Sequence, residues 1–303
     1  ANMIAINQSF PGIKTLGLCH SVQGTAEMLA EDLGENIEDI DYLCAGINHM
    51  AFYQKFEKKA NGKTAEDLYP RLKDIADKIV NDEMVSSRSK KETDYSGKVL
   101  HEKVRYEILR RFGYFVTESS EHFAEYVPWF IKQNRKDIID QYKIPIEEYI
   151  DRCEISIKLW DQLEKDMTPI YNEPLERSNE YASFIMDGVV NNNEVTINAN
   201  VMNDGYIDNL PLNCCVEVPC IINSKGISPQ RFGRLPEHLA ALMRTNINVQ
   251  ILTAEAAITK KREHIYHAAL LDPLTAANLT IDEIYSMTDK MIAAHENYLP
   301  VYN

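Results

Sequence analysis

From Leu235 onward the sequence follows a helical pattern almost without a break, so strands are confined to the part of the chain before it. Apolar residues recur at helical spacing in LPEHLAALMRTNINVQILTAEAAIT, in KREHIYHAALLD and in TIDEIYSMTDKMIAAHENYL. The last stretch opens with Thr280 and, three residues later, Glu283, which is the pattern of a capping box. A fold with more helix than strand follows from this pattern.

Strand patterns are short and scattered. Four segments are expected to form strands: residues 13–18, 41–56, 195–201 and 214–222. The last two are joined by a turn-rich segment and favour a hairpin or meander, while Gly46 marks a bulge or a close backbone approach within the second. A helix at 22–33, ended by Gly34, follows the first strand. Because no complete series of alternating strands and helices occurs, we predict an α+β fold with a mixed or antiparallel sheet.

The other segments are assigned to helices and loops. They are helices at 64–80 and 98–112, a polar mobile loop at 81–97, helices from 120 to 163 interrupted by Pro128 and Pro145, and an irregular connection at 167–180. No internal repeat and no linker divides the sequence. Residues 1–303 are therefore expected to form a single domain.

Composition excludes two classes of partner. The net charge is -14, with 32 Lys and Arg residues against 46 Asp and Glu residues, so a reader of phosphate backbones is disfavoured. No apolar run approaches the length that a membrane span needs. The six cysteines are spread through the chain without a Cys-x-x-Cys pair, which indicates free thiols and a cytoplasmic location.

Two short polar groups follow strand-like runs. Cys19-His20-Ser21 comes after IKTLGL, and Asn48-His49 lies in CAGINHMAF. A thiolate and an imidazole on neighbouring strand ends can share one divalent metal and leave positions open for a substrate. On spacing alone, however, a structural cysteine and a hydrogen-bonded core histidine are the more frequent explanation.

A second polar region runs from Val104 to Glu107 and continues in ESSEHFAEY, which begins at Glu118. It combines a phenol, a guanidinium and a histidine, His122, with several carboxylates, and a tyrosine beside a cation can act as a base if its pKa is lowered. A solvated helix face with ordinary ion pairs is the likelier alternative on sequence alone. The turn NDGYIDNLP, which contains Asn209, favours either a plain hairpin loop or a sugar-binding loop.

Five blocks of the sequence resemble family 4 glycoside hydrolases, and in particular the α-galactosidases of that family. They are LGLCHSVQGTAEMLAEDLG, CAGINHMAFY, GYFVTESSEHFAEY, NDGYIDNLPLNCCVEVPC and LPEHLAALMRTNINVQ. The resemblance implies the carboxy-terminal domain of a fold like that of lactate and malate dehydrogenases. The family's amino-terminal Rossmann domain and its glycine fingerprint have no counterpart in these residues, so we expect a portion of the enzyme with little activity by itself.

The resemblance also implies a chemistry that uses NAD and a divalent metal, usually manganese. In this chemistry NAD takes a hydride from the sugar, a base removes a neighbouring proton, and the aglycone leaves by elimination. By position, Cys19 and His49 match the metal ligands, and His20 matches the acid that protonates the leaving group. Tyr106 is assigned as the base, with the metal and Arg105 as the expected causes of a lowered pKa. Four residues are expected to bind substrate: Asn48, Arg105, His122 and Asn209.

Alternatives remain open at this stage. The chain is expected to act on a small galactoside as a homo-oligomer, and no cluster of basic residues near the candidate site favours a phosphorylated sugar, so a 6-phospho-α-glycosidase is the second choice. A further alternative is a non-catalytic domain that binds sugar or forms a dimer. Its subunit interface would be an apolar helix face formed by Leu239, Leu242, Met243, Ile247 and Ile251. A relative of the 2-hydroxy-acid dehydrogenases would share the fold but gains no support from the Cys-His and Asn-His pairs.

Overall fold

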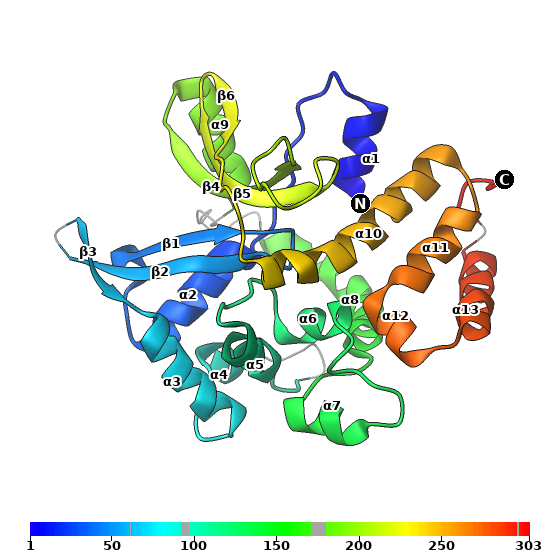
Figure 1. Ribbon diagram of the computed structural model, residues 1–303, viewed down its shortest axis with the longest axis horizontal. Coiled ribbons are helices and arrows are strands. Elements are labelled where there is room, and N and C mark those ends of the chain that lie inside the picture. Colours follow the sequence, from blue (N-terminus) through cyan, green and yellow to red (C-terminus); the bar gives the residue numbers. More distant parts are fainter. Residues whose placement is uncertain (61, 92–96, 171–179, 296) are drawn as a thin grey trace.

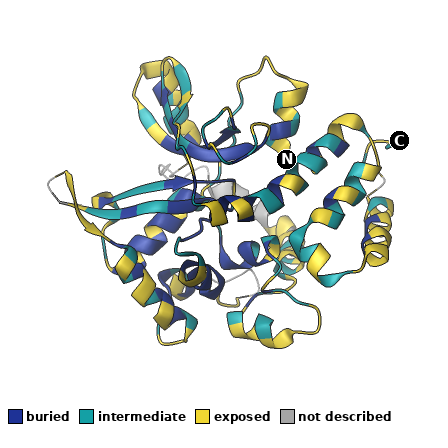
Figure 2. Ribbon diagram, viewed as in Figure 1, coloured by how far each residue is buried: buried dark blue, intermediate teal, exposed yellow. Residues whose placement is uncertain are grey.

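Two small antiparallel sheets, surrounded by helices, make up the chain (Figure 1). The computed structural model describes residues 1–60, 62–91, 97–170, 180–295 and 297–303. Buried positions gather where the two sheets meet and on the inner faces of the helices beside them, whereas much of the C-terminal helical region is exposed (Figure 2). The predicted α+β class is confirmed.

The first sheet has the order β1–β2–β3, with strands β1 (Ile40–Ala45), β2 (Phe52–Ala60) and β3 (Lys63–Asp67). The single strand predicted at 41–56 is wrong, because the chain turns back between Ala45 and Phe52. Gly46 permits this turn through close approach, since a Cβ there would lie 2.6 Å from Ala51 Cα. His49 therefore lies in a turn between two strands.

Three helices cover this sheet: α2 (Ser21–Leu33), α3 (Tyr69–Val80) and α5 (Lys103–Phe112). The apolar face of α2 is buried against the sheet, and Gly34 ends the helix with a left-handed φ of 71°, as predicted. The helices expected at 64–80 and 98–112 both begin about five residues later, and in the first case β3 pairs with β2 instead.

The second sheet contains β4 (Val195–Met202), β5 (Cys215–Asn223) and β6 (Gly226–Pro229), all antiparallel. This confirms the two strands predicted there. Helix α9 (Tyr181–Asn191), which the sequence analysis did not identify, packs on β4 and β5. The strand predicted at 13–18 is wrong: this segment makes only one bridge, between Gly17 and Asn200.

A backbone bridge joins the two sheets. The amide of Gly46 donates to the carbonyl of Glu217 at 3.0 Å, and the amide of Glu217 donates to the carbonyl of Gly46 at 2.8 Å. The bridges at Gly17 and Gly46 bring the ends of segment 13–18 and of β1 to opposite sides of the same residue pair of the second sheet, Asn200 on β4 and Glu217 on β5. Cys19 and His49 follow these two bridges by two and three residues.

The middle of the chain is helical. Besides α5 it contains α4 (Ser87–Lys91), α6 (Ser120–Tyr126), α7 (Lys136–Tyr142) and α8 (Glu148–Ile170). A short 3₁₀ helix, η1 (Ile37–Asp39), lies earlier, between α2 and β1. Breaks near Pro128 and Pro145 agree with the prediction. The loop expected at 81–97 is wrong in part, because α4 lies within it and buries Ser87 and Ser89. Residues 92–96 of that loop, and 171–179 of the irregular connection, lie outside the described residues.

The C-terminal helices are α10 (Glu237–Thr259), α11 (Glu263–Leu271), α12 (Pro273–Asn278) and α13 (Ile281–Ala294), while α1 (Asn2–Ser9) packs on α10. The capping box at Thr280 is confirmed. The apolar face of α10 proposed as a subunit interface is instead buried within the chain, where Leu239, Met243 and Ile247 are fully covered. Among the described residues, no helix has the length and apolarity that a membrane span requires.

Candidate active site

Three side chains from distant parts of the sequence meet at the edge where the sheets are bridged. One ligand atom each from Cys19, His49 and Glu118 lies within 4.8 Å of the other two. The predicted proximity of Cys19 and His49 is therefore confirmed. Glu118 completes a set of thiol, imidazole and carboxylate, a combination that holds divalent metals in proteins.

The backbone places each of these residues. Cys19 lies two residues before α2 begins, and His49 lies in the turn between β1 and β2 with a left-handed φ of 66°. A histidine in that conformation is uncommon and costs about 1 to 3 kcal/mol, a cost typical of functional sites. Glu118 comes directly after a short extended segment, in which Val116 bridges to Phe52 on β2.

The charges at the cluster favour a reactive thiol. Burial raises the pKa of Cys19, but the hydrogen bonds with His49 and Ser21 together lower it by a larger amount. The resulting pKa is about 7, below the usual value of 9.0 for a thiol. Burial lowers the pKa of His49, whereas the hydrogen bond with Cys19 and the charge of Glu118 raise it, and the net change is upward. Thiolate and imidazolium therefore stabilise one another, and a metal cation would take the place of the histidine proton.

Glu118 is fixed by two contacts. Its Oε2 lies 3.0 Å from His49 Nε2, and its Oε1 accepts a hydrogen bond from the amide of Ser119 at 2.9 Å. Sequence analysis included Glu118 in a polar region but assigned it no role at the metal. Its position directly after an apolar run, like the positions of Cys19 and His49, is the signal that could have identified it.

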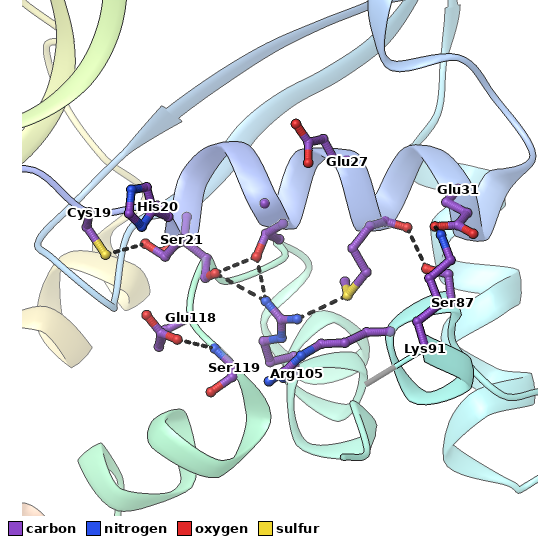
Figure 3. Close-up of a pocket in the computed structure, with 15 residues that line it drawn as sticks. Cys19, His20, Ser21, Glu27, Glu31, Ser87, Lys91, Arg105, Glu118 and Ser119 are labelled. Carbon is purple, nitrogen blue, oxygen red and sulfur yellow. Dashed lines mark hydrogen bonds and ion pairs between the residues drawn. The ribbon is translucent and has the colours of Figure 1, made fainter. Parts of the chain in front are cut away.

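A cavity of about 500 Å³ extends from this cluster along α2 (Figure 3). Cys19, His20 and Glu118 line one end, and Glu31, Ser87 and Lys91 line the other. Its size suits a small sugar and part of an aglycone. The cavity and the cluster therefore form one site.

His20 lies at this site, as predicted. Its ring is largely exposed, and Nε2 lies 2.8 Å from Glu180 Oε2. His20 is also the N-cap residue of α2, and it lines the cavity beside Cys19. This placement allows proton exchange with a group bound beside Cys19.

Tyr106 does not face the cavity, and the expectation that it does is wrong. The side chain is fully buried in the core around α2 and α3, where its hydroxyl donates to Asp32. Burial, followed by the charge of Asp32, raises the pKa of Tyr106 well above its usual range, the reverse of the predicted lowering. A phenol in this position holds α5 against α2 and is not available to a substrate.

The four residues expected to bind substrate have different locations. Arg105 lines the cavity, but its guanidinium is already bound by Glu102 at 2.5 Å and by Thr25 at 2.7 Å. His122 stacks on the ring of His49, with centroids 6.0 Å apart and planes 4° apart. Asn48 is exposed and lines a different cavity, beside Gly17 and Asn200.

Asn209 lies away from the site, and its assignment to the substrate is a further correction. Its amide donates to the carbonyl of Leu235 at 2.9 Å, and its side-chain oxygen accepts from the amide of Leu235 at 3.1 Å. These paired bonds attach the loop after β4 to the start of α10. The contacts of Asn209 therefore favour the plain loop over the sugar-binding loop for the segment NDGYIDNLP.

The cations of the cavity are bound by carboxylates within the described part of the chain. Arg88 pairs with Glu102 and, at 2.9 Å, with Glu121, while Lys91 pairs with Glu31 at 2.7 Å. Glu102 is fully buried and pairs with both Arg88 and Arg105, and Glu121 supplies the second negative charge. The wall of the cavity is thus close to neutral on this side, although three basic residues contribute to it.

Comparison with known proteins agrees with this architecture. Over 97% of its length the chain is 43% identical to an α-galactosidase of Bacillus subtilis (strain 168), and over 100% it is 33% identical to an α-galactosidase of Rhizobium meliloti (strain 1021). These matches cover 63% and 60% of the two relatives, so the chain spans a little over three fifths of their length.

A solved structure has the same fold. A 6-phospho-α-glucosidase from gut microorganisms, in complex with NAD and Mn²⁺, superposes with a TM-score of 0.74 at 17% identity, covering 99% of this chain and 66% of that one. Residues 44–275 match the model of the family 4 glycosyl hydrolase C-terminal domain. This chain therefore belongs to family 4 of the glycosyl hydrolases and carries the C-terminal domain of that family.

Proposed function

We propose that this chain is the metal- and sugar-binding part of an α-galactosidase. The observation that carries the proposal is the cluster of Cys19, His49 and Glu118 at one end of a cavity of about 500 Å³. Similarity to two α-galactosidases over nearly the whole chain supports the choice of substrate class. Because the chain spans only part of those relatives, the proposal concerns the activity of the whole protein.

The donor set fits a divalent cation. A thiol with a pKa of about 7 supplies a thiolate at neutral pH, the imidazole supplies a neutral nitrogen, and Glu118 supplies a carboxylate. Manganese is the metal that we propose, since a family relative of the same fold holds it. A bound cation would polarise sugar oxygens and stabilise negative charge that develops on them.

NAD is proposed as the cofactor of the whole protein. The structurally similar 6-phospho-α-glucosidase holds NAD, but these 303 residues contain no glycine-rich dinucleotide fingerprint. We therefore derive no step for NAD from the residues of this chain. Their part is to hold the metal and the sugar and to move a proton.

His20 is proposed as the group that gives a proton to the leaving oxygen. Its ring lies beside Cys19 in the lining of the cavity and is largely exposed, so it can reach a leaving group bound there (Figure 3). The contact with Glu180 at 2.8 Å orients Nε2 of the ring. The base of the reaction is not Tyr106, because its hydroxyl is buried against Asp32.

An uncharged galactoside is favoured over a phosphorylated one. A phosphate requires free cationic donors, and the basic residues that line the cavity are already paired with Glu31, Glu102 and Glu121. A 6-phospho-α-glycosidase therefore remains the second candidate. It would need one of these ion pairs to open when substrate binds.

Two further expectations stay predictions. All six cysteines are free thiols, which fits the cytoplasmic location that their spacing suggested. A homo-oligomer is still expected, but through a surface other than the buried face of α10.

The deciding experiment is hydrolysis of an aryl α-galactoside by the protein supplied with NAD and Mn²⁺. We expect activity that is lost in a chelator and restored by Mn²⁺, and that is lost in Cys19→Ser. Undiminished hydrolysis in chelator without NAD would overturn the proposal. Binding of neither Mn²⁺ nor a galactoside would overturn the proposal and favour a dimerisation domain.

A further inference from the structure

The two ring nitrogens of His49 have different partners. Nε2 points to the cluster and lies 3.0 Å from Glu118 Oε2, while Nδ1 lies 2.8 Å from the hydroxyl of Tyr126 on α6. A histidine that binds a metal through Nε2 presents a lone pair there and carries its proton on Nδ1. The partner of Nδ1 therefore controls whether the ring is ready for the metal.

Tyr126 is suited to be that partner. A phenol both donates and accepts, so it can bond Nδ1 whether or not that nitrogen carries a proton. The ordinary pKa of a tyrosine hydroxyl is about 10, so the side chain of Tyr126 is a neutral phenol at neutral pH. A neutral oxygen accepts from the Nδ1 proton without adding a second negative charge beside Glu118.

The surroundings fix this pair in place. The carbonyl of Tyr126 accepts a hydrogen bond from Asn246 on α10 at 3.1 Å. On the other side, the ring of His122 stacks on the ring of His49, and the left-handed backbone at His49 restricts the direction of its side chain. A flip of the His49 ring by half a turn would keep the ring plane but break the bond to Tyr126.

We propose that Tyr126 is a positioning residue of the metal site. Its hydroxyl orients the ring of His49 and accepts a hydrogen bond from the protonated Nδ1 when Nε2 binds the cation. The proposal rests on the metal site described under the proposed function. It predicts that Tyr126 contributes to metal affinity without touching the metal. Groups in this position around metal-bound histidines change affinity by about 10- to 100-fold.

The test compares Co²⁺ binding by the wild-type protein, Tyr126→Phe and the control Tyr42→Phe at one pH. Tyr42 is a partly buried tyrosine whose ring packs against Tyr53 and Phe56 on the first sheet. The absorption of the cobalt–thiolate bond reports binding at Cys19 directly. We expect the Kd to rise about tenfold in Tyr126→Phe and to stay within twofold in Tyr42→Phe.

A second measurement does not depend on any variant. Nitrogen-15 NMR of the zinc-loaded wild-type protein should show His49 protonated at Nδ1 and metal-bound at Nε2. A proton on Nε2, or an unchanged Kd in Tyr126→Phe, would overturn the role of Tyr126 while leaving the metal site intact. Failure of the wild-type protein to bind Co²⁺ would overturn the metal site and this inference with it.

Discussion

Glu217 Oε1 accepts a hydrogen bond from Asn200 Nδ2 at 3.5 Å where the two sheets meet, and the other carboxyl oxygen of Glu217 has no hydrogen-bond partner among the described residues. The carboxyl group is completely buried. Burial raises its pKa to about 8, and the charges of Cys19 and Glu118 add to this effect. The folded protein therefore keeps this carboxyl group mainly in its neutral form at neutral pH.

This acid should make stability depend on pH. Between the ordinary carboxyl pKa of 4.5 and the folded value of about 8, the folded protein holds a proton that the unfolded chain has released. The free energy of unfolding must therefore fall as the pH rises through this window, by about 5 kcal/mol. The loss is complete only above the folded pKa.

Glu217→Gln should remove that dependence, because the amide keeps the shape of the neutral acid at every pH. Urea unfolding in chelator should give similar stabilities for variant and wild type at pH 5, and a more stable variant at pH 8.5. Glu154→Gln, on the exposed face of α8, is the control and should follow the wild type. An equal pH dependence in Glu217→Gln and wild type would show that Glu217 is ionised when folded.

Cys19 should be the most reactive thiol of the chain. Its pKa of about 7 gives a thiolate at neutral pH, whereas burial raises the pKa values of Cys44, Cys214, Cys215 and Cys220. Brief treatment with iodoacetamide, followed by peptide mass spectrometry, should therefore modify Cys19 before these four. The rate should increase with pH to a midpoint near 7.

Manganese should protect this thiol. A metal bound at Cys19 occupies the sulfur lone pair, so Mn²⁺ should slow alkylation of Cys19 and leave that of the half-buried Cys153 unchanged. Equal protection of both thiols would indicate a general change of structure. Absence of protection at saturating Mn²⁺ would remove Cys19 from the metal site.

Glu118→Gln should weaken Mn²⁺ binding by at least about tenfold, since loss of an outer partner alone has an effect of that size. The amide retains the shape and the contact with the amide of Ser119 but removes the charge. Isothermal titration measures the change, and Glu125→Gln, a nearby carboxylate beside His122, serves as the control. Equal affinities in Glu118→Gln and wild type would mean that the metal has only two protein ligands.

Local patterns predicted the helices and the second sheet well, because the burial of one face determines each of them. The resemblance to family 4 selected Cys19 and His49, but spacing alone did not. The approach of Glu118 to His49 depends on the bridge between Val116 and Phe52. The approach of Cys19 to His49 depends on the bridges at Gly17 and Gly46. All three are tertiary contacts between residues far apart in sequence. No local pattern encodes them.

The error at Tyr106 has a specific cause. Helix α5 is buried on nearly every side from Lys103 to Leu109, so its polar residues are satisfied inside the core. Arg105 pairs with Glu102, and Tyr106 pairs with Asp32. A sequence in which arginine and tyrosine are adjacent on a helix does not distinguish a cavity wall from an internal network of this kind.

Tyr106→Phe should therefore change stability and not catalysis. Removal of the hydroxyl leaves Asp32 without one of its donors in the core, which should lower the free energy of unfolding by about 1 to 3 kcal/mol. With NAD and Mn²⁺, hydrolysis of an aryl α-galactoside should stay within about threefold of wild type below the unfolding transition. A loss of several hundredfold with unchanged stability would restore Tyr106 as a catalytic residue.

Selection against charged sugars should depend on Glu121. This carboxylate pairs with Arg88 in the wall of the cavity, and Glu121→Gln removes one of the negative charges that Arg88 binds. A guanidinium with fewer ionic partners binds phosphate more strongly, so the ratio of kcat/KM for an aryl α-galactoside to that for its 6-phosphate should fall about tenfold.

The control is Glu27→Gln, which removes an equal charge from an exposed position lining the same cavity. If both variants change the ratio equally, the long-range field of the cavity decides selectivity; if neither does, the sugar C6 position lies away from Arg88.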